Sequence, residues 1–282
     1  MDTLQANQII HGQLAKTGEY DKSPHFLPEN IQFVKSLIQD FTKKFSLDKS
    51  TLFDNCLDLG CGTGFMYEIL KNSSPKSYVG IDITQDMLDV FRQKYPEANL
   101  LMAQAEDIPF EDGTFSFVTN YSFLDHLDDL SSVFSEAYRV LQSGGVFYSG
   151  LIPNASFSVA VRDACDTYSG YMWFDAQHYL EREYKSMHDN GSVYAAQYGF
   201  SPDVLAQAEP QKTNRNGIFI DEINSLLKKK GFGRVFICPN WFFTQVKYKL
   251  TAAEMNVIDR YLKSTGPIGQ SLFKYFDIFA IK

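Results

Sequence analysis

The chain has 282 residues, of which 44% are hydrophobic and 15% aromatic, so it can form one large domain or two small ones with a sizeable core. Its formal net charge of −8 argues against a nucleic-acid partner bound through a broad basic surface. The one basic run, at 228–230, ends a predicted helix, where its charges complement the helix dipole.

Four cysteines, at positions 56, 61, 165 and 238, form no C-x-x-C pair and no cluster with zinc-ligand spacing. We therefore expect no metal site, no disulfide framework and a reducing compartment. No run approaches the ~18 apolar residues of a membrane helix, and the first residues lack the basic and apolar parts of a signal peptide. These features predict a soluble, cytoplasmic protein.

The first 29 residues precede the first recognisable unit. Ile9, Ile10 and Leu14 have roughly helical spacing, and residues 18–25 are typical of a loop. From Pro28 to Phe41, apolar residues recur on one face, which predicts a helix that packs on a sheet.

The central pattern is a strand, a glycine turn and a helix between residues 55 and 71. The strand ends at Leu59, glycines follow at 60, 62 and 64, and the helix begins at Phe65. This order opens a βαβ unit that binds a nucleotide-like ligand, because glycine lets the backbone approach the ligand closely. The spacing is not the G-x-G-x-x-G of dinucleotide folds, and Asp58 would repel a pyrophosphate but suit a cationic amine.

The second strand, predicted at 77–83, ends in Asp82, roughly 20 residues after the glycine turn. An acid at that place can accept hydrogen bonds from both ribose hydroxyls. A ligand with a ribose and an ammonium group but no phosphate suits both Asp58 and Asp82, and S-adenosylmethionine is such a ligand. Further strands are predicted at 100–103, at 115–120 and up to residue 151, with helices at 85–95 and 131–141 between them.

Five blocks lie in order along this region: LDLGCGTG at 57–64, GID at 80–82, AEDIPF at 105–110, FSFV at 115–118 and RVLQSGG at 139–145. Together they resemble the class I S-adenosylmethionine-dependent methyltransferases, in their small-molecule branch. The resemblance covers 30–151 well and 217–282 loosely, and it barely covers 152–216. It implies an α/β, Rossmann-like fold with a seven-stranded mixed sheet, helices on both faces, and a mostly helical cap inserted after the fifth strand.

The resemblance divides the chain into three parts. Residues 1–29 would be a lid segment over the cofactor, 30–151 and 217–282 the cofactor-binding core, and 152–216 a cap over the substrate. The cap is rich in aromatic residues, which suit an apolar pocket, and a helix is predicted at 176–187. After it we expect a helix at 221–230, strand-like stretches at 235–238 and 242–249, a helix at 252–263 and a last strand at 276–281.

The resemblance also implies the cofactor contacts. Asp58 would hold the methionine amino group, Asp82 the ribose, and Ala105 with Gln104 or Glu106 the adenine. The choice between these last two stays open, because the family often has Asp where this chain has Gln104. The complete expected set is Asp58, Gly60, Cys61, Gly62, Gly64, Asp82, Ile83, Gln104, Ala105, Glu106, Asn120 and Tyr121.

Methyl transfer from a sulfonium is an in-line displacement, so the protein mainly aligns the acceptor and excludes water. A base is needed only if the acceptor must lose a proton. His126, just after the fourth strand, is the first candidate base, and His178 in the cap is the second. Tyr20 would orient the acceptor. The other histidines, at 11, 25 and 188, are expected at the surface.

The predicted function is the transfer of a methyl group from S-adenosylmethionine to an O or N atom of a small, apolar or aromatic-rich molecule, with S-adenosylhomocysteine as product. Expected partners are that small molecule and, as an open alternative, a second copy of the chain, with no nucleic acid and no membrane. A non-catalytic cofactor-binding protein, or an enzyme that uses the cofactor for other chemistry, also stays open. A nucleic-acid methyltransferase is disfavoured, because the chain has Asn120-Tyr121-Ser122-Phe123 where an Asn/Asp-Pro-Pro-Tyr-type motif would stand.

Overall fold

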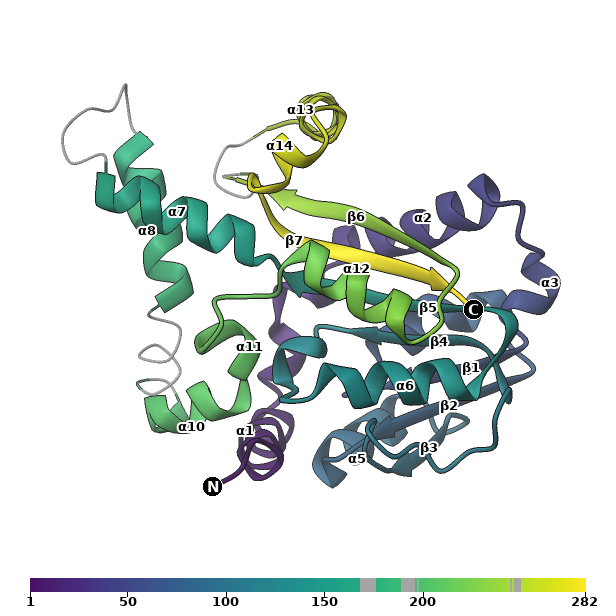
Figure 1. Ribbon diagram of the computed structural model, residues 1–282. Helices are drawn as coiled ribbons and strands as arrows, with labels where there is room; N and C mark the ends of the chain where they lie inside the picture. Colours follow the sequence, from purple (N-terminus) through teal and green to yellow (C-terminus); the bar gives the residue numbers. More distant parts are fainter. Residues whose placement is uncertain (168–175, 189–195, 197, 244, 246–249) are drawn as a thin grey trace.

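The computed structural model describes residues 1–167, 176–188, 196, 198–243, 245 and 250–282. A single seven-stranded sheet has helices on both faces (Figure 1). Its strands are β1 (Asn55–Leu59), β2 (Ser77–Asp82), β3 (Asn99–Met102), β4 (Phe115–Tyr121), β5 (Leu141–Pro153), β6 (Arg234–Phe242) and β7 (Phe273–Ile281). The prediction of an α/β, Rossmann-like fold with a mixed seven-stranded sheet is confirmed.

The strand order is β3-β2-β1-β4-β5-β7-β6. The first five strands of this order are parallel, and β7 runs antiparallel to both β5 and β6. From β1 to β3 the strands are added toward one edge of the sheet, and from β4 onward toward the other, so the strand order switches between β1 and β4. Sheets of this kind bind ligands at the carboxyl ends of the strands beside such a switch.

Helices complete the two outer layers and an insertion. The described helices are α1 (Thr3–Thr17), α2 (Pro28–Lys44), α3 (Lys49–Leu52), α4 (Phe65–Leu70), α5 (Gln85–Lys94), α6 (Leu130–Val140), α7 (Ala155–Thr167), α8 (Ala176–His188), α10 (Pro202–Ala208), α11 (Pro210–Thr213), α12 (Ile220–Lys229), α13 (Ala252–Ser264) and α14 (Pro267–Gln270). Short 3-10 turns are η1 (Tyr20–Lys22), η2 (Pro24–Phe26), η3 (Lys71–Ser73) and η4 (Leu124–His126). None of the helices in the described part is both long and apolar enough to cross a membrane.

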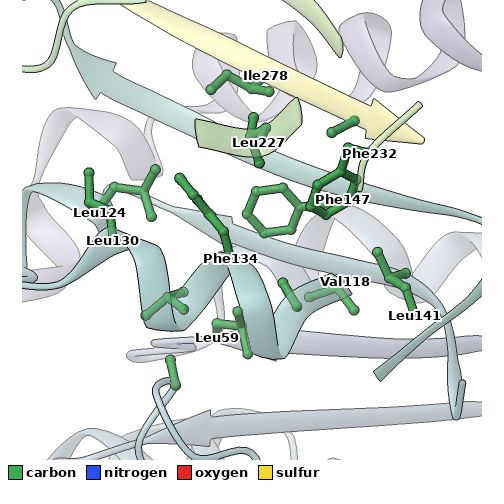
Figure 2. Close-up of a cluster of buried hydrophobic side chains, with 14 of the residues drawn as sticks. Leu59, Val118, Leu124, Leu130, Phe134, Leu141, Phe147, Leu227, Phe232 and Ile278 are labelled. Atoms are coloured by element: carbon green, nitrogen blue, oxygen red, sulfur yellow. The ribbon is translucent and has the colours of Figure 1, made fainter. Parts of the chain in front are cut away.

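One half of the core lies between the sheet and the α6–α12 layer. In Figure 2, Phe134 from α6 and Phe147 from β5 lie side by side, and Leu227 of α12 packs above them. The two phenyl rings meet edge to face with centroids 5.7 Å apart. Complete burial of such side chains contributes about 1.5–3 kcal/mol each, so this cluster fixes α6 against the sheet.

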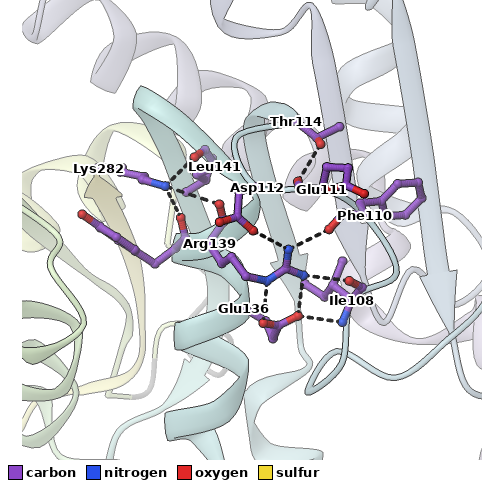
Figure 3. Close-up of polar contacts among 10 residues, drawn as sticks. Ile108, Phe110, Glu111, Asp112, Thr114, Glu136, Arg139, Leu141 and Lys282 are labelled. Atoms are coloured by element: carbon purple, nitrogen blue, oxygen red, sulfur yellow. Dashed lines mark hydrogen bonds and ion pairs between the residues drawn. The ribbon is translucent and has the colours of Figure 1, made fainter.

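A polar network fixes the loop after β3 to the same helix (Figure 3). The Arg139 guanidinium donates to the carbonyl oxygens of Ile108 at 2.8 Å and Phe110 at 2.7 Å, and it forms an ion pair with Asp112 at 2.9 Å. Glu136 pairs with Arg139 and accepts the Ile108 amide at 2.8 Å. Helix α6 therefore sets the position of the loop between β3 and β4, because its side chains bind backbone groups of that loop.

Two sequence predictions at the sheet edge need correction. The predicted strand at 242–249 is wrong at positions 243 and 245, which are turns, and its other residues after Phe242 lie outside the described part. One strand, β6, spans 234–242 instead, because residues 234–240 and 242 pair with β7. The fifth strand also extends to Pro153, two residues beyond the predicted core boundary.

The described residues of the 152–216 insertion are largely helical, as predicted. Figure 1 shows α7 and α8 to one side of the sheet, whereas α10 lies beside α1. Of the aromatic residues that suggested a lined pocket, five lie outside the described part, namely those at 168, 171, 173, 174 and 194. The role of the insertion as a cap stays a prediction.

Candidate functional site

Two cavities meet at the carboxyl ends of the parallel strands. The smaller, of about 280 Å³, lies over the ends of β1, β2 and β3, and the larger, of about 490 Å³, lies beyond the end of β4. Their shared wall contains His11, Tyr20, Ser122 and His126. A molecule in one cavity is therefore separated from a molecule in the other only by these side chains.

The glycine turn and Asp82 form one side of the smaller cavity. The Asp82 carboxylate accepts the backbone amides of Gly62 at 2.9 Å and Thr84 at 2.8 Å, which fixes its orientation toward the cavity. Gly60 has a φ of +61°, and a Cβ there would lie 2.2 Å from the Phe123 ring. Only glycine fits at this position, as the turn pattern predicts.

The side chains around the smaller cavity fit S-adenosylmethionine. Four acids line it, and none of its described lining residues is Lys or Arg: the acids are Asp82, Glu106, Asp128 and Asp129. Such a cavity repels a pyrophosphate and attracts a ligand with a positive sulfonium and ammonium. The acidic side chains that line the cavity therefore disfavour a dinucleotide ligand.

Nine of the predicted site residues line this cavity: Gly60, Gly62, Asp82, Ile83, Gln104, Ala105, Glu106, Tyr20 and His126. Both candidates for the adenine contact, Gln104 and Glu106, are present, and burial raises the pKa of the Glu106 carboxyl.

Five predicted cofactor residues do not line it. Gly64 begins α4 with its Cα facing Phe91 and Tyr95, and Asn120 is fully buried with its side-chain oxygen accepting the Ser149 hydroxyl at 2.6 Å. The remaining three line only a 10 Å³ space behind the glycine turn: Asp58, Cys61 and Tyr121.

Asp58 lies one layer behind the cavity. It is 1% exposed and accepts the Tyr78 hydroxyl at 2.7 Å. Burial raises the pKa of its carboxyl to about 8. The small space beside it shares Tyr20 and Gly60 with the main cavity.

The N-terminal segment covers the cofactor side of the site. Helix α1 contributes Thr3, Leu4, Asn7 and His11 to the smaller cavity, and the Asn7 amide donates to the His126 carbonyl at 3.2 Å. Asp21 accepts the Thr63 hydroxyl at 2.5 Å beside the glycine turn. The segment thus lies where a lid would lie, and its opening stays a prediction.

The larger cavity contains charges of both signs. From η4 it receives Asp125, which is 5% exposed, and His126, whose Nδ1 lies 3.0 Å from the Ala208 carbonyl oxygen. Glu209 and Lys212, from the insertion, line the same cavity as an ion pair at 3.0 Å. Lys22 and Glu19 form a second pair at 2.5 Å.

Two histidines expected at the surface instead line the site. His11 belongs to both cavities, and His25 lies at the larger one. Burial lowers the pKa of His11 to about 3, with help from nearby His126, and burial lowers the pKa of His25 to about 4. Both imidazoles are therefore neutral near pH 7. The side chain of the third, His188, lies outside the described residues.

The structure does not bring His178 to the site. It is exposed on α8, where its ring contacts Tyr179, and it lines neither cavity. A role as catalytic base is not supported by this position, because a base must come within hydrogen-bond reach of the acceptor.

Strained backbone gathers at the larger cavity. Ser122, Leu151 and Trp241 all line it with φ between +50° and +58°, a region costly for residues other than glycine. The buried Asp277 accepts the Leu151 amide at 2.7 Å and the Asn240 side-chain amide at 3.1 Å. This carboxylate therefore holds two of the strained segments in place.

These features place two adjoining cavities, one acidic and one with charges of both signs, at the carboxyl ends of the parallel strands of a Rossmann-like sheet. Residues 57–149 match the model of the family described as "Methyltransferase domain". A methyltransferase of known structure from Mesorhizobium loti, described as S-adenosylmethionine-dependent, has the same fold, with a TM-score of 0.50 at 14% identity over 85% of this chain and 95% of its own. The prediction of a class I S-adenosylmethionine-dependent methyltransferase core is confirmed.

Curated relatives match about a third of this chain. The ubiquinone/menaquinone biosynthesis C-methyltransferase of Desulfotalea psychrophila is 37% identical over 92 residues, which are 32% of this chain and 37% of that protein. The demethylmenaquinone methyltransferase of Listeria welshimeri is 36% identical over 98 residues, 32% of this chain and 42% of that protein. The match thus spans about two fifths of these relatives' length.

Proposed function

We propose that the protein transfers a methyl group from S-adenosylmethionine to a small molecule held in the larger cavity. The observation that supports it most is the shared wall of the two cavities, because in-line displacement needs donor and acceptor in adjoining sites from which water is excluded. The acceptor atom is an O or N atom, and the product of the cofactor is S-adenosylhomocysteine.

Each wall has a separate task in this proposal. Asp82 holds the ribose, the loop at 104–106 holds the adenine, and Asp58 offsets the charge of the amino group from behind the glycine turn. When bound, the cofactor supplies a methyl carbon already activated by the sulfonium. Tyr20 and His126, which border both cavities, orient the acceptor and keep water from the reacting atoms.

The quinones in the relatives' names do not carry over as the acceptor. The matched residues end at 149, whereas much of the larger cavity is built from residues before 26 and after 150. Tyr198, Glu209, Lys212, Trp241 and Tyr275 lie outside the matched stretch. The similarity therefore supports the cofactor and the reaction, and the acceptor must be argued from the cavity.

A turnover experiment tests this proposal against a protein that only binds the cofactor. The protein is incubated with S-adenosylmethionine and with panels of hydroxyl and amine acceptors. The expected result is release of S-adenosylhomocysteine with a methyl mass gain in one acceptor class. Cofactor binding by calorimetry, without release of S-adenosylhomocysteine from any panel, would show a binding protein instead.

A further inference from the structure

An acidic subsite lies at the boundary of the two cavities. Asp125 is 5% exposed, and its Oδ1 has no hydrogen-bond partner among the described residues. The His126 Nε2 lies 3.9 Å from this oxygen, and one ligand atom each from Asp125, His126 and Glu209 fall within 4.8 Å of one another. A buried carboxylate oxygen without a donor is costly, so the subsite is built for a positively charged or proton-donating group.

The tautomer of His126 is fixed by the insertion. Its Nδ1 lies 3.0 Å from the Ala208 carbonyl, and a carbonyl only accepts, so Nδ1 carries the proton. In the neutral ring Nε2 therefore has a free lone pair, on the side of Asp125. The insertion is held here by a second bond, from the Gln211 amide to the Leu127 carbonyl at 2.8 Å.

The charges around this subsite distinguish a divalent metal from a monovalent cation. Asp125 and Glu209 contribute two negative charges, and Lys212, paired with Glu209 at 3.0 Å, returns one positive charge. Glu209 and then Asp125, acting against the effect of burial, raise the pKa of Lys212 above its ordinary range, so this charge is permanent. The net charge of Asp125, Glu209 and Lys212 together is −1. One ammonium neutralises it, whereas a divalent ion would leave a net positive charge beside a lysine.

We propose that the methyl acceptor is an amine whose nitrogen enters as an ammonium between Asp125 and Glu209 and is deprotonated there by the Nε2 of His126. This rests on the proposed function, and it narrows the acceptor atom from O or N to N. His126 borders both cavities, so the nitrogen it deprotonates lies next to the cofactor cavity.

The step balances in protons and electrons. The ammonium gives one proton to Nε2, and the freed nitrogen lone pair forms the bond to the methyl carbon while the carbon–sulfur bond breaks and its electron pair stays on sulfur. The product is a protonated N-methyl amine, and the His126 imidazolium, facing Asp125, returns its proton to solvent. Without the deprotonation there is no lone pair to attack, so a base is required for an amine that binds charged.

The rest of the larger cavity suits an aromatic body for this amine. Tyr20, Tyr198, Trp241 and Tyr275 line it, and the Trp241 and Tyr275 rings meet at right angles with centroids 5.7 Å apart. Such walls bind an apolar ring and leave the acidic subsite for the charged end. An arylalkylamine combines both features.

Binding of 2-phenylethylamine to the full-length protein, measured by calorimetry without the cofactor, tests the subsite independently of turnover. Its neutral counterpart, 2-phenylethanol, is measured in parallel. We expect the amine to bind at least about tenfold more tightly than the alcohol, a difference of about 1.4 kcal/mol. Equal affinity for the two, or no binding of the amine, would overturn the proposal, as would stoichiometric binding of Mn²⁺ that excludes the amine.

Two substitutions that change the charge of the subsite in opposite directions distinguish an electrostatic effect on binding from a loss of folding. D125N is expected to weaken amine binding about tenfold, and K212Q is expected to strengthen it, because each changes the subsite by one charge in opposite directions. D163N, at an exposed position on α7, is the matched control and should change nothing. The same sign of change in D125N and K212Q would contradict the proposal.

The role of His126 is tested by a pH profile with 2-phenylethylamine as acceptor. The kcat/KM is expected to rise with pH in the wild type and to lose that rise in H126Q, because glutamine cannot accept the proton of the ammonium. If the rise remains in H126Q, His126 is not the base. Methylation of hydroxyl acceptors in a protein that rejects the amine would leave the proposed function intact and exclude this inference alone.

Discussion

The two cavities of this protein are built in different ways. The cofactor cavity takes most of its lining from consecutive strand ends between residues 60 and 129, with α1 added from the N-terminus. The larger cavity takes its lining from the N-terminal turns, from η4, from the end of β5, from the insertion and from β6 and β7. The cofactor cavity is formed mainly by segments that follow one another in the βαβ order, whereas the larger cavity forms only when segments far apart in the sequence pack together.

The backbone conformations at the two cavities differ in the same way. At the cofactor, the positive φ angles belong to Gly60 and Gly62, which take them at little cost. At the larger cavity they belong to Leu151 and Trp241 and, on the wall shared with the cofactor cavity, to Ser122, each at a cost of order 1 kcal/mol or more. The strained side therefore depends on buried tertiary contacts such as those of Asp277, and the cofactor side does not.

The largest expected effect is on the cofactor side. D82A removes the acceptor for the ribose and leaves the Gly62 and Thr84 amides without their partner. We expect S-adenosylmethionine binding to weaken about a hundredfold, or about 2.7 kcal/mol, as measured by calorimetry. D89A, an exposed acid on α5, is the control. Unchanged affinity in D82A would place the cofactor elsewhere.

The second effect belongs to the acceptor side alone. D277A leaves the Leu151 amide and the Asn240 side chain without their acceptor, which should lower the free energy of unfolding by about 1–3 kcal/mol in a urea titration. Methyl transfer should fall more than the affinity for the cofactor, because Leu151 and Trp241 line the larger cavity and not the smaller one. A parallel loss of cofactor affinity would show that the two cavities are not independent.

A third effect tests the loop that carries the adenine contacts. R139Q breaks the bonds to the Ile108 and Phe110 carbonyls shown in Figure 3, so the loop at 104–113 loses its anchor on α6. We expect cofactor binding to weaken about tenfold, or about 1.4 kcal/mol, and amine binding to stay unchanged. R162Q, at a part-exposed position on α7, serves as the control. Weakened amine binding would mean that this loop also shapes the larger cavity.

The cofactor side could be predicted from the sequence because its signals are local. The glycine turn, Asp82 and the 104–106 loop each follow a strand within a few residues, and spacing alone places them together. Even there, Asp58 and Asn120 were assigned to the cofactor by their motif position, and the structure turns both into the interior.

The acceptor side could not be predicted because its residues meet only in three dimensions. His11 belongs to a helix without a recognised motif, and Glu209 lies 83 positions after His126. No spacing rule connects His11, His126 and Glu209. The extent of β6 likewise depends on its pairing with β7, a strand more than thirty residues away, which is why the expected strand was wrong at positions 243 and 245. Tertiary context decides both cases.

The smallest effect concerns the buried Asp58 behind the glycine turn. With its pKa raised to about 8 by burial, this carboxyl is largely protonated at pH 7 in the free protein. Its folded-state pKa lies above the unfolded one, so its contribution to stability is complete at low pH and is lost as pH rises from about 4 to about 8.

A bound ammonium nearby reverses this preference, because it favours the ionised carboxylate. Cofactor binding should then release close to one proton at pH 7, seen as a dependence of the calorimetric enthalpy on the ionisation enthalpy of the buffer, and affinity should rise about fivefold from pH 7 to pH 8. D58N should abolish both effects, with Y78F as a control that removes the hydrogen bond but keeps the carboxyl. If proton release persists in D58N, the proton comes from Asp82 or Glu106, whose pKa values burial also raises. Asp58 would then be a structural residue of the turn.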